Sequence, residues 1–204
     1  MLVDPIVLLA FIPASLALNL TPGADMMFCL GQGLRHGPRA AMAANLGIGV
    51  GGFIQAIVAG LGLGAAIAAL PGAFDVIRWV GVAYLLWLAI GALRSSPISD
   101  VAAPTNHAFR DAVIVNLTNP KVILFTLAFV PQFVDPAKSV LGQFVIFGLV
   151  MFLGGLVING SVGVFAGSIG RRLARSPRFA RVLGYISAGV FAGLALRLAV
   201  MEKT

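Results

Sequence analysis

Charged residues are scarce in this chain. Only 10% of its 204 residues are Asp, Glu, Lys or Arg, whereas 59% are hydrophobic. Soluble domains contain about 25% charged residues, and a chain of this length leaves much of its surface outside any core. The composition therefore excludes an ordinary soluble domain and predicts a single transmembrane domain that covers residues 1–204 in a lipid bilayer.

Paired cysteines, nucleotide-binding loops and catalytic triads are also missing. Cys29 is the only cysteine, so neither an intrachain disulfide nor a CxxC redox pair can form. No phosphate-binding loop or nucleophile–base motif is recognisable, and no metal-ligand spacing joins His36 and His107. The sequence predicts a protein that is not an enzyme and has no cofactor and no metal site. Any transport would draw on an ion gradient or on the substrate's own gradient.

The chain has instead six long apolar stretches. A transmembrane helix needs about 20 mostly apolar residues, and the N-terminus lacks the basic region of a secretory signal, so the first stretch is retained as a span. We expect spans at about Pro5–Leu34, Arg39–Leu70, Val76–Leu93, Arg110–Phe133, Ser139–Ile169 and Phe179–Val200. The predicted fold is therefore all-α, with six transmembrane helices, of which the first and the fourth are broken by prolines near the bilayer midplane.

Positive charges are distributed unevenly between the two sides of these spans. The net charge is +7, and an excess of Lys and Arg in short loops marks the cytoplasmic side of a membrane protein, so we predict no nucleic-acid partner. One set of loops holds Arg35, Arg39, Arg94, Arg110, Arg171, Arg172, Arg175, Arg178 and Arg181. The opposite side balances cations with acids: Arg78, Lys138, Arg197, Lys203, Asp4, Asp75, Asp135 and Glu202. This pattern predicts a multi-pass protein of the bacterial inner membrane with both termini outside.

Two related sequences interrupt the first and the fourth span. The first reads Asn19-Leu20-Thr21-Pro22 and the second reads Asn116-Leu117-Thr118-Asn119-Pro120. Each falls in the first span of a three-span half, which indicates an internal duplication with repeats at about 1–97 and 107–204. Because three is an odd number, the second repeat enters the membrane from the opposite face. Inverted repeats with matching broken helices are typical of secondary transporters, whose binding site lies at the breaks.

Each break has the residues of a helix start. Thr21 suits the N-cap position and Pro22 the first turn of a helix, and Asn119 with Pro120 repeats this pattern. We expect the two new half-helices to direct the positive ends of their dipoles at one site, which favours an anion such as a carboxylate. The alternative is a pair of kinked helices whose free backbone groups bond to Thr21, Thr118 and neighbouring spans.

Two ionisable residues lie deep in the spans, next to the breaks. Asp25 follows the first break within one turn, and Lys121 follows the second directly. A charge at the bilayer centre costs at least about 2.5–3.5 kcal/mol. A helix N-terminus stabilises Asp25 but not Lys121, so Lys121 needs Asp25, a substrate carboxylate or water as a partner. Either the two form a permanent structural ion pair, or substrate or a proton breaks and remakes the pair during transport.

Other polar and small residues in the spans have two interpretations. Asn19 and Asn116 end the first half-helices and could line a cavity. Hydrogen bonds between helices are at least as well suited to Asn45, Gln55, Gln143 and Asn159. Glycines four residues apart permit close helix contact within one protomer or between two, so a homodimer is compatible with the sequence. These pairs are Gly47/Gly51, Gly60/Gly64, Gly163/Gly167 and Gly189/Gly193.

Two motifs resemble signatures of the LysE-type translocators. Thr21-Pro22-Gly23-Ala24-Asp25 resembles the Thr/Ser-Pro-Gly-Pro-Asp motif of their first span. Asn116-Leu-Thr-Asn-Pro-Lys121, followed by Phe129-Val-Pro-Gln-Phe133, resembles their Asn-Pro-Lys…Phe-Pro-Gln-Phe motif. The resemblance covers nearly the whole chain. One position departs from the family pattern, because Ala24 replaces the second proline of the first motif, and this predicts a softer helix break.

The resemblance implies a secondary-active exporter by alternating access, of the homoserine, threonine and leucine branch, with small neutral amino acids and protons as its partners. The substrate site would comprise Asn19, Thr21, Pro22, Gly23, Asp25, Asn116, Thr118, Asn119, Pro120 and Lys121. Asp25 would meet the substrate ammonium or carry the coupling proton. The amides of Gly23 and Lys121, with the Lys121 side chain, would hold the carboxylate. The alternatives are a cation or metal effluxer of the same superfamily and a non-catalytic membrane scaffold.

Overall fold

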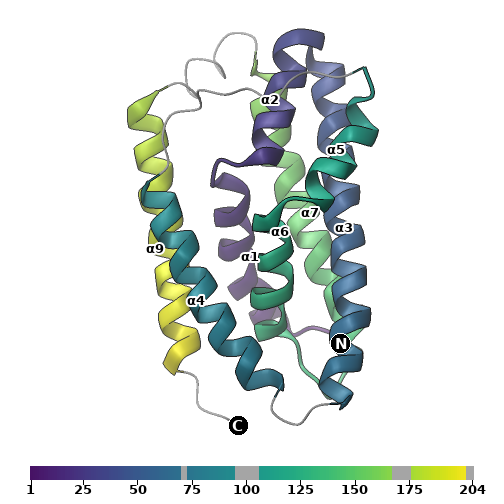
Figure 1. The fold of residues 1–204 in the computed structure, drawn as a ribbon, viewed down its shortest axis with the longest axis vertical. Coiled ribbons are helices and arrows are strands. Elements are labelled where there is room, and N and C mark those ends of the chain that lie inside the picture. Colours follow the sequence, from purple (N-terminus) through teal and green to yellow (C-terminus); the bar gives the residue numbers. More distant parts are fainter. Residues whose placement is uncertain (70–72, 95–105, 167–175, 201–204) are drawn as a thin grey trace.

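The computed structural model describes residues 1–69, 73–94, 106–166 and 176–200, and all regular structure in this part of the chain is helical. The elements are α1 (Pro5–Leu20), α2 (Ala24–His36), α3 (Pro38–Ala69), α4 (Ala73–Leu93), α5 (Ala108–Leu117), α6 (Pro120–Leu124), the π-helical turn η1 (Phe125–Phe129), the 3₁₀ turn η2 (Val130–Phe133), α7 (Val140–Val164) and α9 (Pro177–Val200). The helices run along the long axis of one elongated bundle (Figure 1). The predicted all-α fold is confirmed for these residues.

Several of the helices are long and apolar enough to cross a bilayer. α3 qualifies over Pro38–Leu63 and α7 over Val140–Val164. Two bent pairs also qualify if each is one span, namely α1 with α2 and α5 with Pro120–Phe133, which gives up to four candidate spans among the described residues. α4 and α9 contain shorter apolar stretches, Trp79–Leu93 and Arg181–Leu196. These helices are those of an integral membrane protein.

The first and the fourth predicted stretch are broken where the prolines indicated. α1 and α2 meet at 55° across residues 21–23, and α5 meets the following helix at 50°. In Figure 1 both breaks lie near mid-height of the bundle, and the two broken helices run in opposite directions. Ala24, which replaces the second proline of the motif, does not make the first bend smaller than the second. The breaks thus place two sets of helix ends inside the bundle.

The interior forms where the first and the second half of the chain meet. α3 packs along α5 and α7, and α4 packs along α9, with α1 between the two groups in Figure 1. α1 contacts α7 and α9, and η1 contacts α4. Between them lies an aromatic cluster whose neighbouring ring centroids are 4.7–6.3 Å apart. Its members are Phe11, Phe125, Phe129, Phe133 and Phe147.

Glycines let the helices approach so closely that a methyl group would not fit. A Cβ added at Gly148 would lie 2.7 Å from the Cβ of Ala56, which joins α7 to α3. The predicted role of glycine in packing within the protomer is confirmed at Gly47, Gly51, Gly60 and Gly163, whereas Gly189 and Gly193 face open space. Gly167 lies outside the described residues, and so do the surroundings of Gly64.

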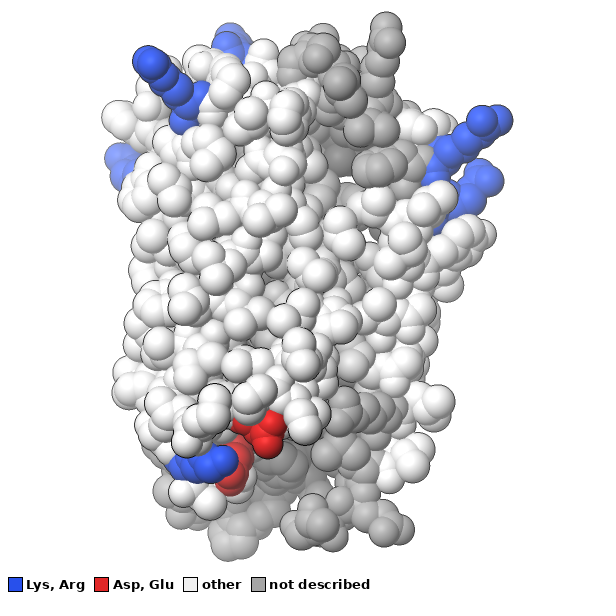
Figure 2. Space-filling model, turned by 180° about the vertical axis from the view of Figure 1, so that it is seen from behind, with Lys and Arg blue, Asp and Glu red and all other residues white. Residues whose placement is uncertain are grey.

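The surface of the bundle is apolar around its middle and charged at its ends. Val58, Leu61, Trp87, Val157 and Leu196 are all more than half exposed, as lipid-facing side chains are. Figure 2 shows Lys and Arg gathered at one end, and acidic and basic side chains together at the other. The basic end is opposite to the end at which α1 begins and α9 finishes in Figure 1. The predicted separation of charge is therefore present in the described part of the chain.

Among the described residues each end has one ion pair, Arg110 with Asp111 at the basic end and Lys138 with Asp135 at the other. The exposed cations of the basic end are Arg35, Arg39, Arg94, Arg110, Arg178 and Arg181. At the other end Asp135 accepts a hydrogen bond from the Ala137 amide and pairs with Lys138, and both contacts lower the pKa of its carboxyl. The remaining predicted charges lie outside the described side chains, and they are Asp75, Arg78, Arg171, Arg172, Arg175, Arg197, Glu202 and Lys203.

Candidate functional site

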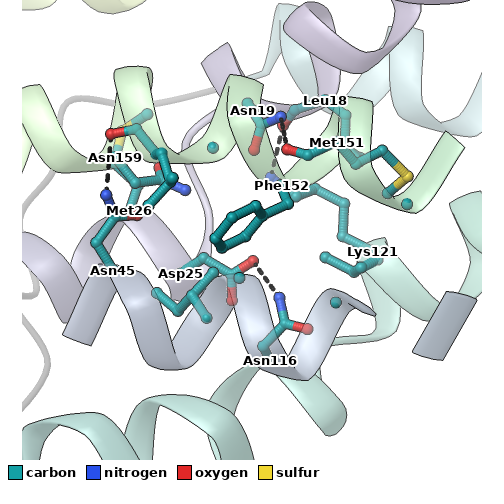
Figure 3. Close-up of a pocket in the computed structure, with 17 residues that line it drawn as sticks. Leu18, Asn19, Asp25, Met26, Asn45, Asn116, Lys121, Met151, Phe152 and Asn159 are labelled. Atoms are coloured by element: carbon teal, nitrogen blue, oxygen red, sulfur yellow. Dashed lines mark hydrogen bonds between the residues drawn. The ribbon is translucent and has the colours of Figure 1, made fainter. Parts of the chain in front are cut away.

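A small polar cavity lies between the two helix breaks, inside the bundle. Its volume is about 40 Å³, which suits a few water molecules, because each needs roughly 10–15 Å³ on this scale. Residues of α1, α2, α3, α5, α6 and α7 line it. The polar members of the lining are Asn19, Asp25, Asn45, Asn116, Lys121 and Asn159 (Figure 3). Polar side chains from both halves of the chain therefore share one small space inside the bundle.

The first break is not the helix start that the sequence predicted. α2 begins at Ala24, and its N-cap residue is Gly23, which offers no side chain. Thr21 instead ends α1, and its hydroxyl donates to the carbonyl oxygen of Ala17 at 2.7 Å. The prediction that Thr21 is the N-cap and Pro22 the first helical residue is wrong. Residues 21–23 form the connection between α1 and α2, so the second helix starts later.

The second break has the predicted cap. The side chain of Asn119 accepts a hydrogen bond from the Lys121 amide at 3.0 Å, and Pro120 begins α6. This bond satisfies one of the amides that a helix start leaves without an intrahelical partner. The sequence had predicted that the Lys121 amide would be free to bind a carboxylate. This amide instead donates to Asn119, so that prediction is wrong.

The Lys121 side chain reaches from the second break to the first. Its Nζ donates to the carbonyl oxygens of Leu18 at 3.0 Å and Thr21 at 2.8 Å. These carbonyls end α1, where they lack intrahelical partners and carry the negative end of the helix dipole. Sequence reasoning missed this partner, because it requires knowing that the end of α1 faces α6. Gly23 leaves room for the ammonium, since a Cβ there would lie 3.0 Å from Nζ.

Asp25 faces the same cavity from the first turn of α2. Its residue exposure is only 7%, and its Oδ2 accepts a hydrogen bond from Nδ2 of Asn116 at 3.0 Å (Figure 3). Its other oxygen, Oδ1, is buried with no hydrogen bond within 3.5 Å, and the Asn119 side chain is a second polar neighbour of this carboxylate. In the part of the chain that the structure describes, no ion pair joins Asp25 to Lys121. The hypothesis of a permanent Asp25–Lys121 pair is therefore wrong for this conformation.

A chain of hydrogen bonds connects Asp25 to α3. Nε2 of Gln55 donates to the carbonyl oxygen of Asn116 at 2.6 Å and also lies 3.4 Å from its Oδ1. Gly51 permits this approach, because a Cβ there would lie 2.9 Å from the Cβ of Asn116. Gln55 occupies the oxygens of Asn116, so the Asn116 amide nitrogen is directed at Asp25. The interhelical bonding predicted for Gln55 is confirmed.

Hydrogen-bond acceptors dominate the unpaired polar atoms of the cavity. Nδ2 of Asn45 donates to the Leu156 carbonyl at 2.9 Å, which confirms its predicted bond between helices. Three buried side-chain oxygens of the lining then have no partner, namely Oδ1 of Asp25, Asn45 and Asn159. Asn45 and Asn159 were not predicted as site residues, because only the packing of α3 on α7 brings them beside Asp25. The cavity is chemically suited to a group rich in N–H donors.

The predicted site residues divide into two groups. Four of them line the cavity, and these are Asn19, Asp25, Asn116 and Lys121. The others belong to the breaks without reaching the cavity, and these are Thr21, Pro22, Gly23, Thr118, Asn119 and Pro120. Thr118 is exposed, and its hydroxyl donates to the Ile114 carbonyl at 2.8 Å. The sequence had offered no signal for the apolar lining, which includes Met26, Ile48, Met151, Phe152 and Leu156.

The described residues include few side chains that could bind a metal ion together. No group of three or more His, Cys, Asp or Glu side chains gathers among them. Cys29 is buried in an apolar cluster with Phe28, Ala44 and Ile48. Asp25 is thus the only acidic side chain among the cavity-lining residues.

Comparison with known proteins identifies a family and several relatives of the chain. A family model described as LysE type translocator matches residues 16–202. The chain is 33% identical to a homoserine/homoserine lactone efflux protein of Salmonella typhimurium, over 73% of this chain and 75% of that protein. It is 30% identical to a leucine efflux protein of an Enterobacter species, over 90% of each. It is 32% identical to an uncharacterized membrane protein of Vibrio cholerae, over 95% of this chain and 97% of the other. No solved structure matches the chain.

Proposed function

Since the chain belongs to the LysE type translocator family, we propose that it is a secondary-active exporter of small neutral amino acids such as threonine, homoserine or leucine. The observation that carries this proposal is the central cavity, where Asp25 and Lys121 from the two helix breaks face one buried space. Charges inside a membrane protein are costly and mark substrate or ion pathways. Two relatives are named for efflux of homoserine or leucine.

The acceptor-rich side of the cavity would bind the substrate's ammonium group. An ammonium has three N–H donors, and three buried oxygens without partners are available on Asp25, Asn45 and Asn159. The carboxylate would lie near Lys121, which uses two of its own donors on Leu18 and Thr21. The free amides at the start of α2 add positive character to that side of the cavity.

The apolar lining favours a neutral substrate side chain. Met26, Ile48, Met151, Phe152 and Leu156 supply it, and none of them can compensate a second charge. A charged substrate side chain would lose its hydration there without a partner, which costs several kcal/mol. Lysine and glutamate are therefore poor substrates in this proposal.

Transport would proceed by alternating access between two inverted three-span repeats, about 1–97 and 107–204. Some of the packing pairs support this symmetry. α1 packs on α7 and the corresponding α5 packs on α3, while α2 packs on α7 and the corresponding η1 packs on α3. α3 with α7 and α4 with α9 pair equivalent helices. The contacts of α1 with α9, of η1 with α4 and of α2 with α3 depart from the pattern.

The orientation and the energy source complete the proposal. The basic end would face the cytoplasm of a bacterium, with both termini outside, as the excess of arginine there predicts. Asp25 would bind the substrate ammonium in one half of the cycle and a proton in the other, which couples export to proton entry. A homodimer through the open glycines of α9 would be compatible with this mechanism.

The test is transport by the purified chain in proteoliposomes. Liposomes loaded with unlabelled threonine, homoserine or leucine should accumulate the labelled amino acid by exchange, and empty liposomes should not. Lysine, glutamate and Zn²⁺ are the comparison solutes. Exchange of none of the three neutral amino acids would overturn the proposal. Movement of Zn²⁺ alone would indicate a metal effluxer, and movement of no solute would indicate a scaffold.

A further inference from the structure

The Phe152 ring lies inside the polar cavity, where a substrate side chain would need space. Phe152 belongs to α7, and Figure 3 shows its ring beside the Asp25 carboxylate, among the labelled polar residues. The cavity has a volume of only about 40 Å³. The position of this ring therefore affects how much room remains in the cavity that Asp25 lines.

Gly49 of α3 holds the ring in its present position. A Cβ added to Gly49 would lie 2.0 Å from both Cδ2 and Cε2 of Phe152. Real Cβ atoms do not approach other atoms this closely, so any other residue at 49 would force the ring to move. The ring thus lies directly on the backbone of α3, at the part of the cavity wall that Gly49 and Phe152 form together.

Close glycine contacts also bring α3 and α7 together on both sides of Phe152. A Cβ at Gly148 would lie 2.7 Å from that of Ala56, and one at Gly163 would lie 2.8 Å from that of Ala41. Interiors packed this tightly respond to added volume by shifts of side chains and of backbone. A substitution at Gly49 or Phe152 is therefore expected to change the volume of the cavity that both residues line.

We propose that Phe152, seated on Gly49, sets the upper limit on the size of the substrate side chain. The inference rests on the proposed export of amino acids, but it concerns selection among them. A smaller side chain at 152 enlarges the space beside Asp25 and admits larger apolar substrates. A methyl group at 49 adds volume where Gly49 and Phe152 meet at the cavity wall, and it excludes them. Phe152 is a specificity-determining residue, and Gly49 is its positioning residue.

Substitution of Phe152 is the first test. Exchange of labelled threonine is measured in proteoliposomes with unlabelled threonine, leucine or phenylalanine as competitor. Phe152→Leu and Phe152→Ala should improve competition by the larger amino acids relative to threonine about tenfold, the discrimination expected for one or two methylene groups. Phe165→Leu is the matched control, because Phe165 is exposed at the end of α7. An unchanged order of competitors in both Phe152 variants would overturn the inference.

Substitution of Gly49 tests the same contact in the opposite direction. Gly49→Ala should reduce competition by leucine relative to threonine about tenfold, and adding Phe152→Leu should restore it. Gly62→Ala is the control, since a Cβ at this other glycine of α3 meets no atom within 4 Å. If Gly49→Ala does not fold, the double variant and the Phe152 variants decide the question. Failure of the wild-type chain to exchange any amino acid would instead contradict the proposed function.

Discussion

Nζ of Lys121 lies 2.8 Å from the carbonyl oxygen of Thr21, so a residue of the second helix break closes the first. A second bond to Leu18 at 3.0 Å completes the contact. The ammonium group of Lys121 thus compensates the negative end of the α1 dipole. Asp25, at the start of α2, accepts a hydrogen bond from Asn116 but forms no ion pair with Lys121. The two broken helices meet through this side chain and through the bond between Asn116 and Asp25, and any opening of the cavity must move Lys121 or carry α1 with it.

Replacing Lys121 should therefore affect folding and transport together. Lys121→Gln removes the charge that the carbonyls of Leu18 and Thr21 share, and unpaired buried acceptors cost about 1–3 kcal/mol. We expect a lower melting temperature in detergent and loss of amino-acid exchange in proteoliposomes. Lys138→Gln, an exposed lysine at one end of the bundle, is the control and should change neither. Normal exchange by the Lys121→Gln variant would contradict a role in substrate binding.

Asn116 and Thr118 belong to the same break but should respond differently. Asn116→Ala removes the donor that holds Oδ2 of Asp25 at 3.0 Å, and loss of a buried hydrogen bond to a carboxylate costs about 1.5–3 kcal/mol. The apparent affinity for threonine should fall roughly tenfold or more, since 1.4 kcal/mol is one factor of ten. Thr118→Ala should leave affinity unchanged, because its hydroxyl only bonds to the preceding turn. Equal effects of the two variants would show that the Asp25 contact is unimportant.

Substitution of Asp25 is expected to abolish proton-driven export while amino-acid exchange persists. Asp25→Asn keeps the shape of the side chain but cannot bind and release a proton. A pH gradient across the liposome membrane should accelerate threonine export by the wild-type chain and have no effect on the variant. Exchange without a gradient should persist in the variant at reduced affinity, because amide and backbone groups still line the cavity. Acceleration of equal size in both proteins would exclude Asp25 as the coupling site.

Ala24 offers a test of the first break itself. Ala24 is the first residue of α2, and Gly23 before it has the extended backbone that proline requires of its predecessor. Ala24→Pro should therefore be tolerated and raise stability by about 0.4–1 kcal/mol, because proline restricts the unfolded chain. Ala44→Pro inside α3 should destabilise by about 3 kcal/mol or more. The melting temperatures of the two variants in detergent measure the difference, and destabilisation by Ala24→Pro would mean that the helix starts elsewhere.

Much of the fold could be predicted from the order of the residues. Long apolar runs, proline within two of them and arginine between them indicate helices, breaks and charged ends, because these are local properties of the chain in lipid. Asp25 and Lys121 could be predicted at a common site, since a charge in the membrane interior requires an enclosed polar environment. Their cavity confirms that they face the same space.

The sequence by itself determined the helical class, the position of the two breaks and the presence of an acid and a base beside them. Only the tertiary structure decided the partners. It placed Lys121 on the carbonyls of α1, Asn45 and Asn159 beside Asp25, and Phe152 against Gly49. The physical reason is that each of these contacts joins helices remote in the sequence, and close glycine packing sets which faces of those helices meet.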